Sequence, residues 1–219
     1  MREGTAINKL LSISSEALGP VPKSMPGAWQ SSPLASALFH LLQQKNGFYA
    51  FEQALHILPL ESDITGTMTL EEWNSETLWK SAYKGMTNGL LFFGEDVFGD
   101  QFCLSKSDSG VFHFDAEYGS ANLVAPSMEK WAELISSDYE AQTGWRSAHE
   151  WQAEHGPLGL GQRLQPKIPF AYGGDYSLQN LWAGDAVKGM LFKAEVALKV
   201  RDLPAGTELR LEVGKKGTT

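Results

Sequence analysis

The sequence is poor in cysteine, in positive charge and in long apolar runs. Its one cysteine, Cys103, excludes an internal disulfide framework, and its apolar neighbours are typical of a small buried side chain. Acidic residues outnumber basic ones by 26 to 18, so nucleic acid and anionic membranes, which are polyanions, are unfavourable partners. Neither a secretory h-region nor an apolar run of about 18 residues is present. These absences predict a soluble cytoplasmic protein that binds neither nucleic acid nor membrane.

Motifs for phosphate binding, metal binding and nucleophilic catalysis are also missing. The glycine-rich stretch Gly156–Gly161 lacks the lysine-serine pair and the strand-to-helix setting of a phosphate loop. His149 and His155 could supply metal ligands near one helix end, but HExxH and CxxC spacings are absent and such residues more often line a solvated face. No GxSxG elbow is present. We therefore predict no catalytic residue, no metal and no cofactor.

Length and apolar content are sufficient for one domain, with or without an extension. The 219 residues are 42% apolar and include seven tryptophans and eleven phenylalanines, which supply large surfaces for a core. The charge is uneven, because residues 188–219 carry seven basic and four acidic side chains while the preceding part carries 11 and 22. The acidic character therefore belongs to the first 187 residues.

Patterning divides the chain into an arm, a domain and a tail. Residues 1–32 hold a weak helical segment and then Pro20, Pro22 and Pro26, so we interpret them as a loosely attached, flexible arm. A single domain follows over 33–213, with a tail at 214–219. Apolar spacing predicts helices over 34–42, 48–58, 75–83, 127–143, 145–155 and 185–200, and strands over 90–93, 101–105, 111–115, 122–124 and 207–213. Residues 64–70 fit a strand or a loop equally. The order of helices, strands, helices and strand favours an α+β fold.

The region between Gly89 and Ala125 is the most informative part of the chain. Its short apolar runs are separated by acidic, glycine-containing turns, a pattern typical of a strand meander. The carboxylates there are Glu95, Asp96, Asp100, Asp108, Asp115 and Glu117, and the fixed cation among them is Lys106. Interleaved aromatic residues would allow an acidic rim to steer and anchor a cationic partner. Alternatively, the aromatic side chains point into the core and the acids only keep the protein soluble.

The order of short motifs along the chain resembles the SUKH superfamily, the group of bacterial immunity proteins and fungal Smi/Knr cell-wall-synthesis regulators. The motifs are Asn46-Gly47-Phe48, Trp73-Asn74, residues 90–104, residues 111–119 and the helix opening Ser127–Trp131. In that family, an FGD-like turn joins two strands, and an early tryptophan of the following helix packs on the sheet. The positions that correspond to this structural motif are Trp79, Phe98, Gly99, Asp100 and Trp131.

The resemblance implies a central antiparallel or mixed sheet flanked by helices, with a C-terminal helix-strand extension. It also implies a non-enzymatic protein that neutralises a cognate bacterial toxin, often a nuclease, by occlusion and without a cofactor. An acidic inhibitor suits a cationic toxin domain, because opposite charges accelerate encounter. The candidate contacts are the acids expected at the periphery and one aromatic neighbour: Glu95, Asp96, Asp108, Glu117 and Tyr118. Two alternatives are a regulatory scaffold without a toxin and a hydrolase that uses the acidic rim.

Overall fold

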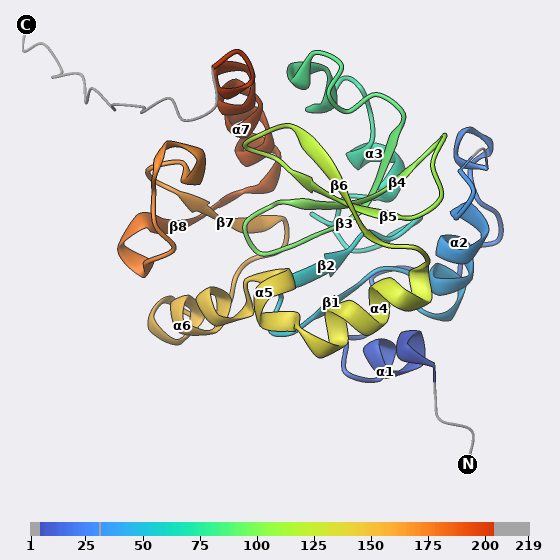
Figure 1. The fold of residues 1–219 in the computed structure, drawn as a ribbon. Coiled ribbons are helices and arrows are strands. Elements are labelled where there is room, and N and C mark those ends of the chain that lie inside the picture. The colour runs from blue at the N-terminus through green and yellow to red at the C-terminus, as the bar shows by residue number, and fades with distance from the viewer. Residues whose placement is uncertain (1–4, 31, 204–219) are drawn as a thin grey trace, which may run out of the picture.

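Six strands form one antiparallel sheet in which each strand pairs with its neighbour in the sequence. The computed structural model describes residues 5–30 and 32–203, and Figure 1 shows the sheet at the centre with helices around it. The strand order is β1-β2-β3-β4-β5-β6. The strands are β1 (Phe48–Ala50), β2 (Leu55–Ile57), β3 (Leu90–Glu95), β4 (Gln101–Ser105), β5 (Val111–Asp115) and β6 (Ser120–Ala125). The predicted α+β fold is confirmed.

The meander follows from apolar patterning and turn chemistry. Strands β4 and β5 occupy the predicted ranges, while β3 and β6 are slightly longer than predicted. Almost every residue of β3 and β4 is buried, which explains why these strands read as continuous apolar runs. The predicted strand over 207–213 and the tail at 214–219 lie outside the described residues.

The helix predicted over residues 48–58 is wrong, because β1 and β2 form a hairpin there. Residues 51–53 connect the strands with φ values of 51°, 54° and 67°, so the chain turns through three successive left-handed positions. Every residue of both strands is buried. The sequence therefore lacks the alternation of apolar and polar residues that marks a half-exposed strand. Periodicity alone cannot decide whether such a short apolar run forms a helix or a strand.

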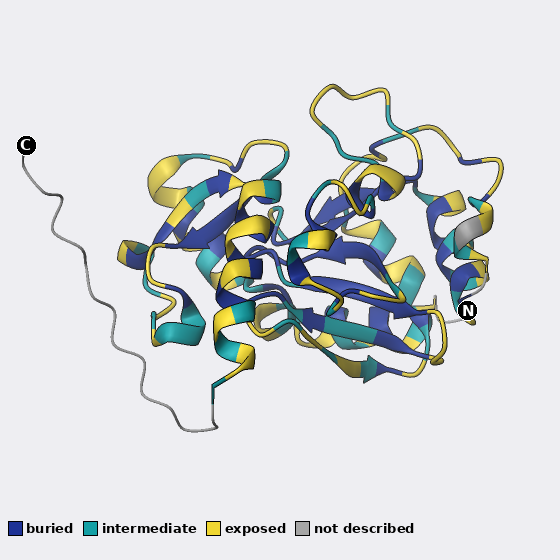
Figure 2. Cartoon of the chain, turned by 90° about the horizontal axis from the view of Figure 1, so that it is seen from above, coloured by how far each residue is buried: buried dark blue, intermediate teal, exposed yellow. Residues whose placement is uncertain are grey.

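Helices cover the sheet and leave their outer faces exposed to solvent (Figure 2). The α-helices are α1 (Ala6–Ser12), α2 (Ala35–Gln44), α3 (Leu70–Trp73), α4 (Met128–Ser137), α5 (Tyr139–Thr143), α6 (Trp145–His155) and α7 (Ala186–Arg201). The 3-10 helices are η1 (Gly27–Trp29), η2 (Lys80–Tyr83), η3 (Phe170–Tyr172) and η4 (Leu178–Asn180). Ser127 and Asp185 cap α4 and α7. Of the helix predicted over 75–83, only η2 forms.

Among the described residues, no helix has the length and apolarity needed to cross a membrane.

A second, smaller sheet follows α6 and was not predicted from the sequence. Strands β7 (Gln162–Pro166) and β8 (Leu181–Asp185) pair antiparallel. They pack with α6 around a second apolar cluster that contains Val97, Phe98 and Trp151. The β3–β4 turn thus contributes residues to the second cluster, so the C-terminal hairpin is built onto the end of the main sheet.

The expectation of a loosely attached N-terminal arm is wrong for residues 5–30. Helix α1 packs against α4, and Leu10 is fully buried in the main core. The backbone N–H groups of Ala6 and Ile7 both donate to the Glu129 carboxylate. The Asn46 side chain donates to the Pro20 carbonyl at 2.6 Å, which secures the proline-rich stretch. Its prolines exclude a regular helix but not an ordered path over the surface.

A buried ionic network connects the large sheet to the β7–β8 hairpin. Arg163 of β7 is fully buried, and its Nη2 lies 2.8 Å from Oε1 of Glu95 at the end of β3. Nδ1 of His56 lies 3.0 Å from the same oxygen. The Gln101 side-chain amide donates to the other carboxylate oxygen at 3.3 Å, and the Trp73 indole donates to Gln101 at 2.8 Å. One carboxylate therefore connects β2, β3, β4 and β7.

Pairing keeps Glu95 ionised although it is buried. Burial raises the pKa of Glu95, but Arg163 and His56 lower it, and the resulting pKa is about 2. Burial lowers the pKa of His56, so its ring is neutral at neutral pH and Nδ1–H donates to Glu95. Removing one member of such a network leaves an uncompensated buried charge, which is strongly destabilising.

Leu10→Ala tests whether the N-terminal segment belongs to the cooperative fold. We expect it to lower the free energy of unfolding by about 2–5 kcal/mol, because the side chain is fully buried. Ile13→Ala is the matched control, since Ile13 is 51% exposed, and should change it by no more than about 0.5 kcal/mol. Denaturation in urea measures both. If Leu10→Ala changes the free energy of unfolding as little as Ile13→Ala does, the N-terminal segment is not part of the cooperative fold.

Acid is expected to destabilise the fold through Glu95 and His56. The folded pKa of Glu95 lies below its ordinary value of 4.5, so its stabilising contribution is present above that pH and is lost as the pH falls toward about 2. The folded pKa of His56 lies below 6.5, so acidification below that value also favours the unfolded state. Urea midpoints at a series of pH values measure the loss.

Glu95→Gln assigns this pH dependence to the network. The variant should be less stable at neutral pH by about 3–5 kcal/mol, because Arg163 loses its counter-charge. It should also lose the part of the acid sensitivity that belongs to Glu95. Glu133→Gln, at an exposed position on α4, should keep the wild-type profile. A Glu95→Gln protein with wild-type stability and pH profile would contradict the role of the network.

Candidate partner-binding site

A pocket with several carboxylates lies at the end of the main sheet, beside α5 and α6. Its volume is about 550 Å³. Its lining residues include Asp96, Phe98, Asp100, His113, Asp115, Glu140, Gly144, Arg146 and Tyr176. We call this site the acidic pocket. It combines the β3–β4 turn, the end of β5, the α5–α6 junction and the β7–β8 connection.

The β3–β4 turn is built around Asp96. Its Oδ1 accepts hydrogen bonds from the backbone N–H groups of Phe98 and Asp100, both at 2.9 Å. Gly99 has φ +87°, a conformation that a residue with a Cβ adopts only with strain. The Phe98-Gly99-Asp100 segment therefore folds into a tight turn that places two carboxylates on the pocket wall.

The β5–β6 turn brings Asp115 to the same wall. Oδ1 of Asp115 accepts the backbone N–H groups of Glu117 and Tyr118 at 3.0 Å, which organises this turn. Oδ1 of Asp100 accepts the N–H of Ala116 at 3.0 Å and so connects the two turns. Both aspartates are held by backbone groups, so their carboxylates are fixed before any partner arrives.

Aromatic side chains and one ion pair also line the pocket. The ring centroids of Tyr176 and Phe98 lie 5.1 Å apart. Gly144 allows the α5–α6 junction to approach Phe98, because its φ is +67° and a Cβ there would lie 2.4 Å from the Phe98 ring. Arg146 is paired with Glu140 at 2.8 Å, and its ion pairs among the described residues do not include the pocket aspartates.

The electrostatics of the pocket favour an incoming positive charge. Burial and the neighbouring Asp100 raise the pKa of Asp96 well above its ordinary range. Burial and Asp100 also raise the pKa of Asp115. Burial raises the pKa of Tyr176 to about 12, with the carboxylates of Asp100 and Asp96 adding to the effect. The buried Lys193 compensates part of this negative charge, because its Nζ lies 3.9 Å from Asp100, donates to the Phe98 carbonyl and lowers the pKa of Asp96. Carboxylates with raised pKa values are stabilised by a nearby cation.

Three of the pocket residues could also hold a metal ion. Asp96, Asp100 and His113 each offer a ligand atom, and these atoms lie within 4.8 Å of one another. Oxygen and imidazole ligands suit several divalent cations. The histidines weighed from the sequence are engaged elsewhere, since His149 pairs with Glu52 at 2.8 Å and His155 stacks on Trp151.

The predicted partner contacts do not form one exposed rim. Glu95, Asp96 and Glu117 are 2%, 6% and 3% exposed, so the expectation of peripheral acids is wrong for these three. Glu95 belongs to the ionic network, and Glu117 accepts the Ala171 N–H at 2.7 Å. Asp108 is exposed and accepts hydroxyl hydrogen bonds within the β4–β5 turn, and Tyr118 is 48% exposed. A binding role for these residues stays a prediction.

The structural motif residues lie on both sides of the main sheet. Trp131 of α4 is fully buried and packs edge-on against Phe93 and Phe102. Trp79 is also fully buried and packs against Phe92, among other aromatic rings. Phe98 and Gly99 belong to the turn of the acidic pocket.

Burial raises the pKa of Cys103, which keeps its thiol protonated.

Several site residues were missed from the sequence. Tyr176 and Arg163 come from the unpredicted hairpin, and Glu140 and Arg146 look like ordinary residues of an exposed helix. His56 was assigned to a helical pattern. The sequence did contain a partial signal for two separate roles of Glu95 and Asp96. Successive residues of a strand point to opposite faces of the sheet, so this acidic pair places one carboxylate on each face.

Comparisons with known proteins agree with this architecture. The fold is similar to the crystal structure of Atu4351 from Agrobacterium tumefaciens, with a TM-score of 0.53 and 15% identity over 84% of this chain and 86% of that chain. At this identity the likeness concerns the fold alone. No curated protein matches the sequence. A family model does match, over residues 33–134, which run from just before α2 into α4. These residues are an SMI1/KNR4 family (SUKH-1) domain, and the resemblance to the SUKH superfamily is confirmed.

Proposed function

We propose that this protein is a non-enzymatic binding protein that neutralises a cationic toxin domain by occluding it in the cytoplasm of the cell that makes both. The observation that carries the proposal is the acidic pocket, where Asp96, Asp100 and Asp115 converge. The family domain supports a binding role, since immunity proteins occur in the SUKH superfamily. A lysine or arginine side chain of the toxin fills the pocket.

The pocket suits a guanidinium group in both charge and shape. Its carboxylates are fixed by backbone N–H groups, so little ordering entropy is lost when a partner binds. Tyr176 and Phe98 add aromatic faces, against which a planar cation gains cation–π attraction. Opposite charge also accelerates encounter between the partners. Occlusion by this surface requires no cofactor and no catalytic step.

Replacing Asp100 and Asp115, the two half-buried aspartates of the pocket, tests the proposal. Asp100→Asn with Asp115→Asn keeps the oxygen atoms that accept backbone hydrogen bonds, and removes two negative charges. Binding to the toxin domain encoded by an adjacent gene should weaken by about 2–5 kcal/mol, roughly 30-fold or more. Surface plasmon resonance measures the affinity, and growth during co-expression with the toxin measures protection.

Asp108→Asn is the comparison variant, since Asp108 is an exposed candidate contact in another turn, outside the acidic pocket. It should change affinity less than about threefold, as expected for an exposed rim charge. Wild-type binding by the pocket variant, together with weak binding by Asp108→Asn, would move the interface to the β4–β5 turn. Absence of any toxin gene beside this one would favour the regulatory scaffold instead.

The acidic pocket should also reduce stability, as expected of a site kept for binding. The folded pKa of Asp96 lies above 3.8, so its favourable contribution is present below that pH and is lost as the pH rises through the folded pKa. Asp96→Asn retains the Oδ1 acceptor and removes the charge. We expect the variant to be more stable than the wild type near pH 7, with a gain that shrinks toward about pH 4, in urea denaturation. Destabilisation at neutral pH would contradict this account.

A further inference from the structure

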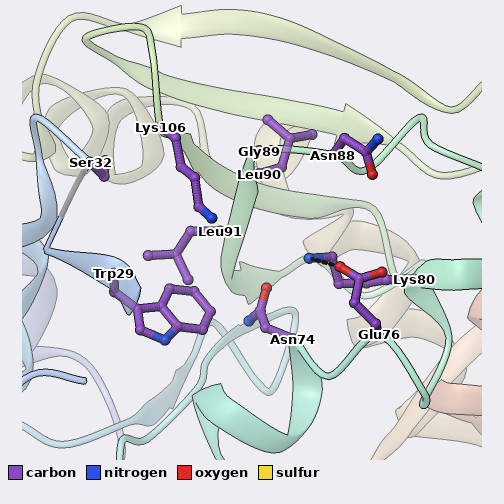
Figure 3. Close-up of a pocket in the computed structure, with 10 residues that line it drawn as sticks. All are labelled: Trp29, Ser32, Asn74, Glu76, Lys80, Asn88, Gly89, Leu90, Leu91 and Lys106. Atoms are coloured by element: carbon purple, nitrogen blue, oxygen red, sulfur yellow. Dashed lines mark ion pairs between the residues drawn. The ribbon is translucent and has the colours of Figure 1, made fainter. Parts of the chain in front are cut away.

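A second cavity, about 260 Å³ in volume, lies on another part of the molecule, between η1 and the start of β3. Figure 3 shows the Trp29 ring and Leu91 on one side of it and the Lys80–Glu76 pair on the other. The Lys106 side chain reaches toward Leu91 from the end of β4 in the same view. The residues come from four separate segments, so the cavity exists only in the folded chain.

The charge of this cavity is opposite to that of the protein. The chain carries a formal net charge of −8, yet two lysines and one glutamate line the cavity. Glu76 is neutralised by Lys80, whose Nζ lies 3.0 Å from its carboxylate. Lys106 is exposed and makes no ion pair with any residue between 5 and 203 that the structure describes. One positive charge is therefore available to a ligand.

Hydrogen bonds hold parts of the cavity lining in place, and other parts of the lining are apolar. Asn74 uses its side-chain amide on the backbone of β3, donating to the Phe92 carbonyl at 2.7 Å and accepting its N–H at 3.0 Å. The Lys106 N–H donates to the Gly89 carbonyl at 2.9 Å, which fixes the base of the lysine. Leu91 is 3% exposed, and the Trp29 indole is half-buried, so a flat ring has an aromatic and an aliphatic surface to contact.

One buried polar side chain beside the cavity has no hydrogen-bond partner among the described residues. Ser32 lines the cavity and is 6% exposed, and its Oγ has no hydrogen-bond partner among the described residues. A buried hydroxyl without a partner costs free energy, and an acceptor on a ligand would relieve that cost. Apolar cavities of about 150 Å³ hold one benzene molecule, so this cavity has room for a single ring with a small substituent.

We propose that this cavity binds a small aromatic carboxylate, with the ring against Trp29 and Leu91 and the carboxylate on Lys106. The charge of Lys106 selects an anion, the Trp29 and Leu91 surfaces select a ring, and the volume admits a single ring with a small substituent. The site is separate from the acidic pocket and does not depend on the function proposed for it.

Benzoate is the probe, and benzamide is its neutral counterpart of nearly the same shape. Titration into the ¹⁵N-labelled full chain, followed by amide chemical shifts, should perturb Gly89, Leu90 and Lys106. Benzoate should bind about tenfold more tightly than benzamide, and sodium chloride should weaken benzoate binding, because the interaction involves an exposed charge.

Lys106→Gln is expected to reduce benzoate affinity about tenfold and to make benzoate and benzamide bind equally. Lys106 is exposed, so its replacement is not expected to disturb folding, and circular dichroism checks this. Lys199→Gln, at an exposed position on α7, is the matched control and should bind like the wild type. Trp29→Ala should weaken both probes.

Three results would overturn the proposal. One is the absence of amide shifts at Gly89, Leu90 and Lys106 at saturating benzoate. Another is equal affinity of the wild-type protein for benzoate and benzamide. The third is wild-type affinity in Lys106→Gln. The first two use only the wild-type chain, so they hold whatever the variants do.

Discussion

The ion pair between Glu95 and Arg163 is the interaction on which the arrangement of the molecule depends. It joins the end of β3 in the family domain to β7 in the C-terminal hairpin, with both side chains almost fully buried. Two buried charges are tolerated only when each is well compensated. His56 and Gln101 provide the further contacts to the carboxylate. The hairpin carries Tyr176, so the same pair fixes one wall of the acidic pocket.

Adjacent residues in the β3–β4 turn have opposite effects on stability. Glu95 faces a cation, and its pKa is lowered to about 2, so its ionised form stabilises the fold. Asp96 lies beside Asp100, and burial and that carboxylate raise its pKa more than Lys193 lowers it, so its ionised form destabilises the fold. A partner cation would give Asp96 the compensation that Arg163 gives Glu95. In this account, the pocket is an incomplete ion-pair network that binding completes.

The sequence was sufficient to predict the meander but not the site. An apolar run located β4 and an alternating pattern located β5, each bounded by turn residues, and Asp185 marked the start of α7, because these signals are local. The β1–β2 hairpin was mistaken for a helix, since its strands are short and buried on both faces. Strand β7 reads as polar because it carries Arg163, whose burial depends on Glu95 far away in the sequence. The burial of Glu117 likewise depends on a contact with Ala171 that no local pattern records.

Proton release during complex formation shows whether a partner cation completes the charge network of the acidic pocket. If a toxin cation enters the acidic pocket, the pKa values of Asp96 and Asp115 fall and protons leave the protein. Isothermal titration calorimetry at about pH 5, in buffers of different ionisation enthalpy, measures that release. We expect net proton release with the wild type and a clear reduction when both residues are changed to asparagine. Binding without proton release by the wild type would contradict it.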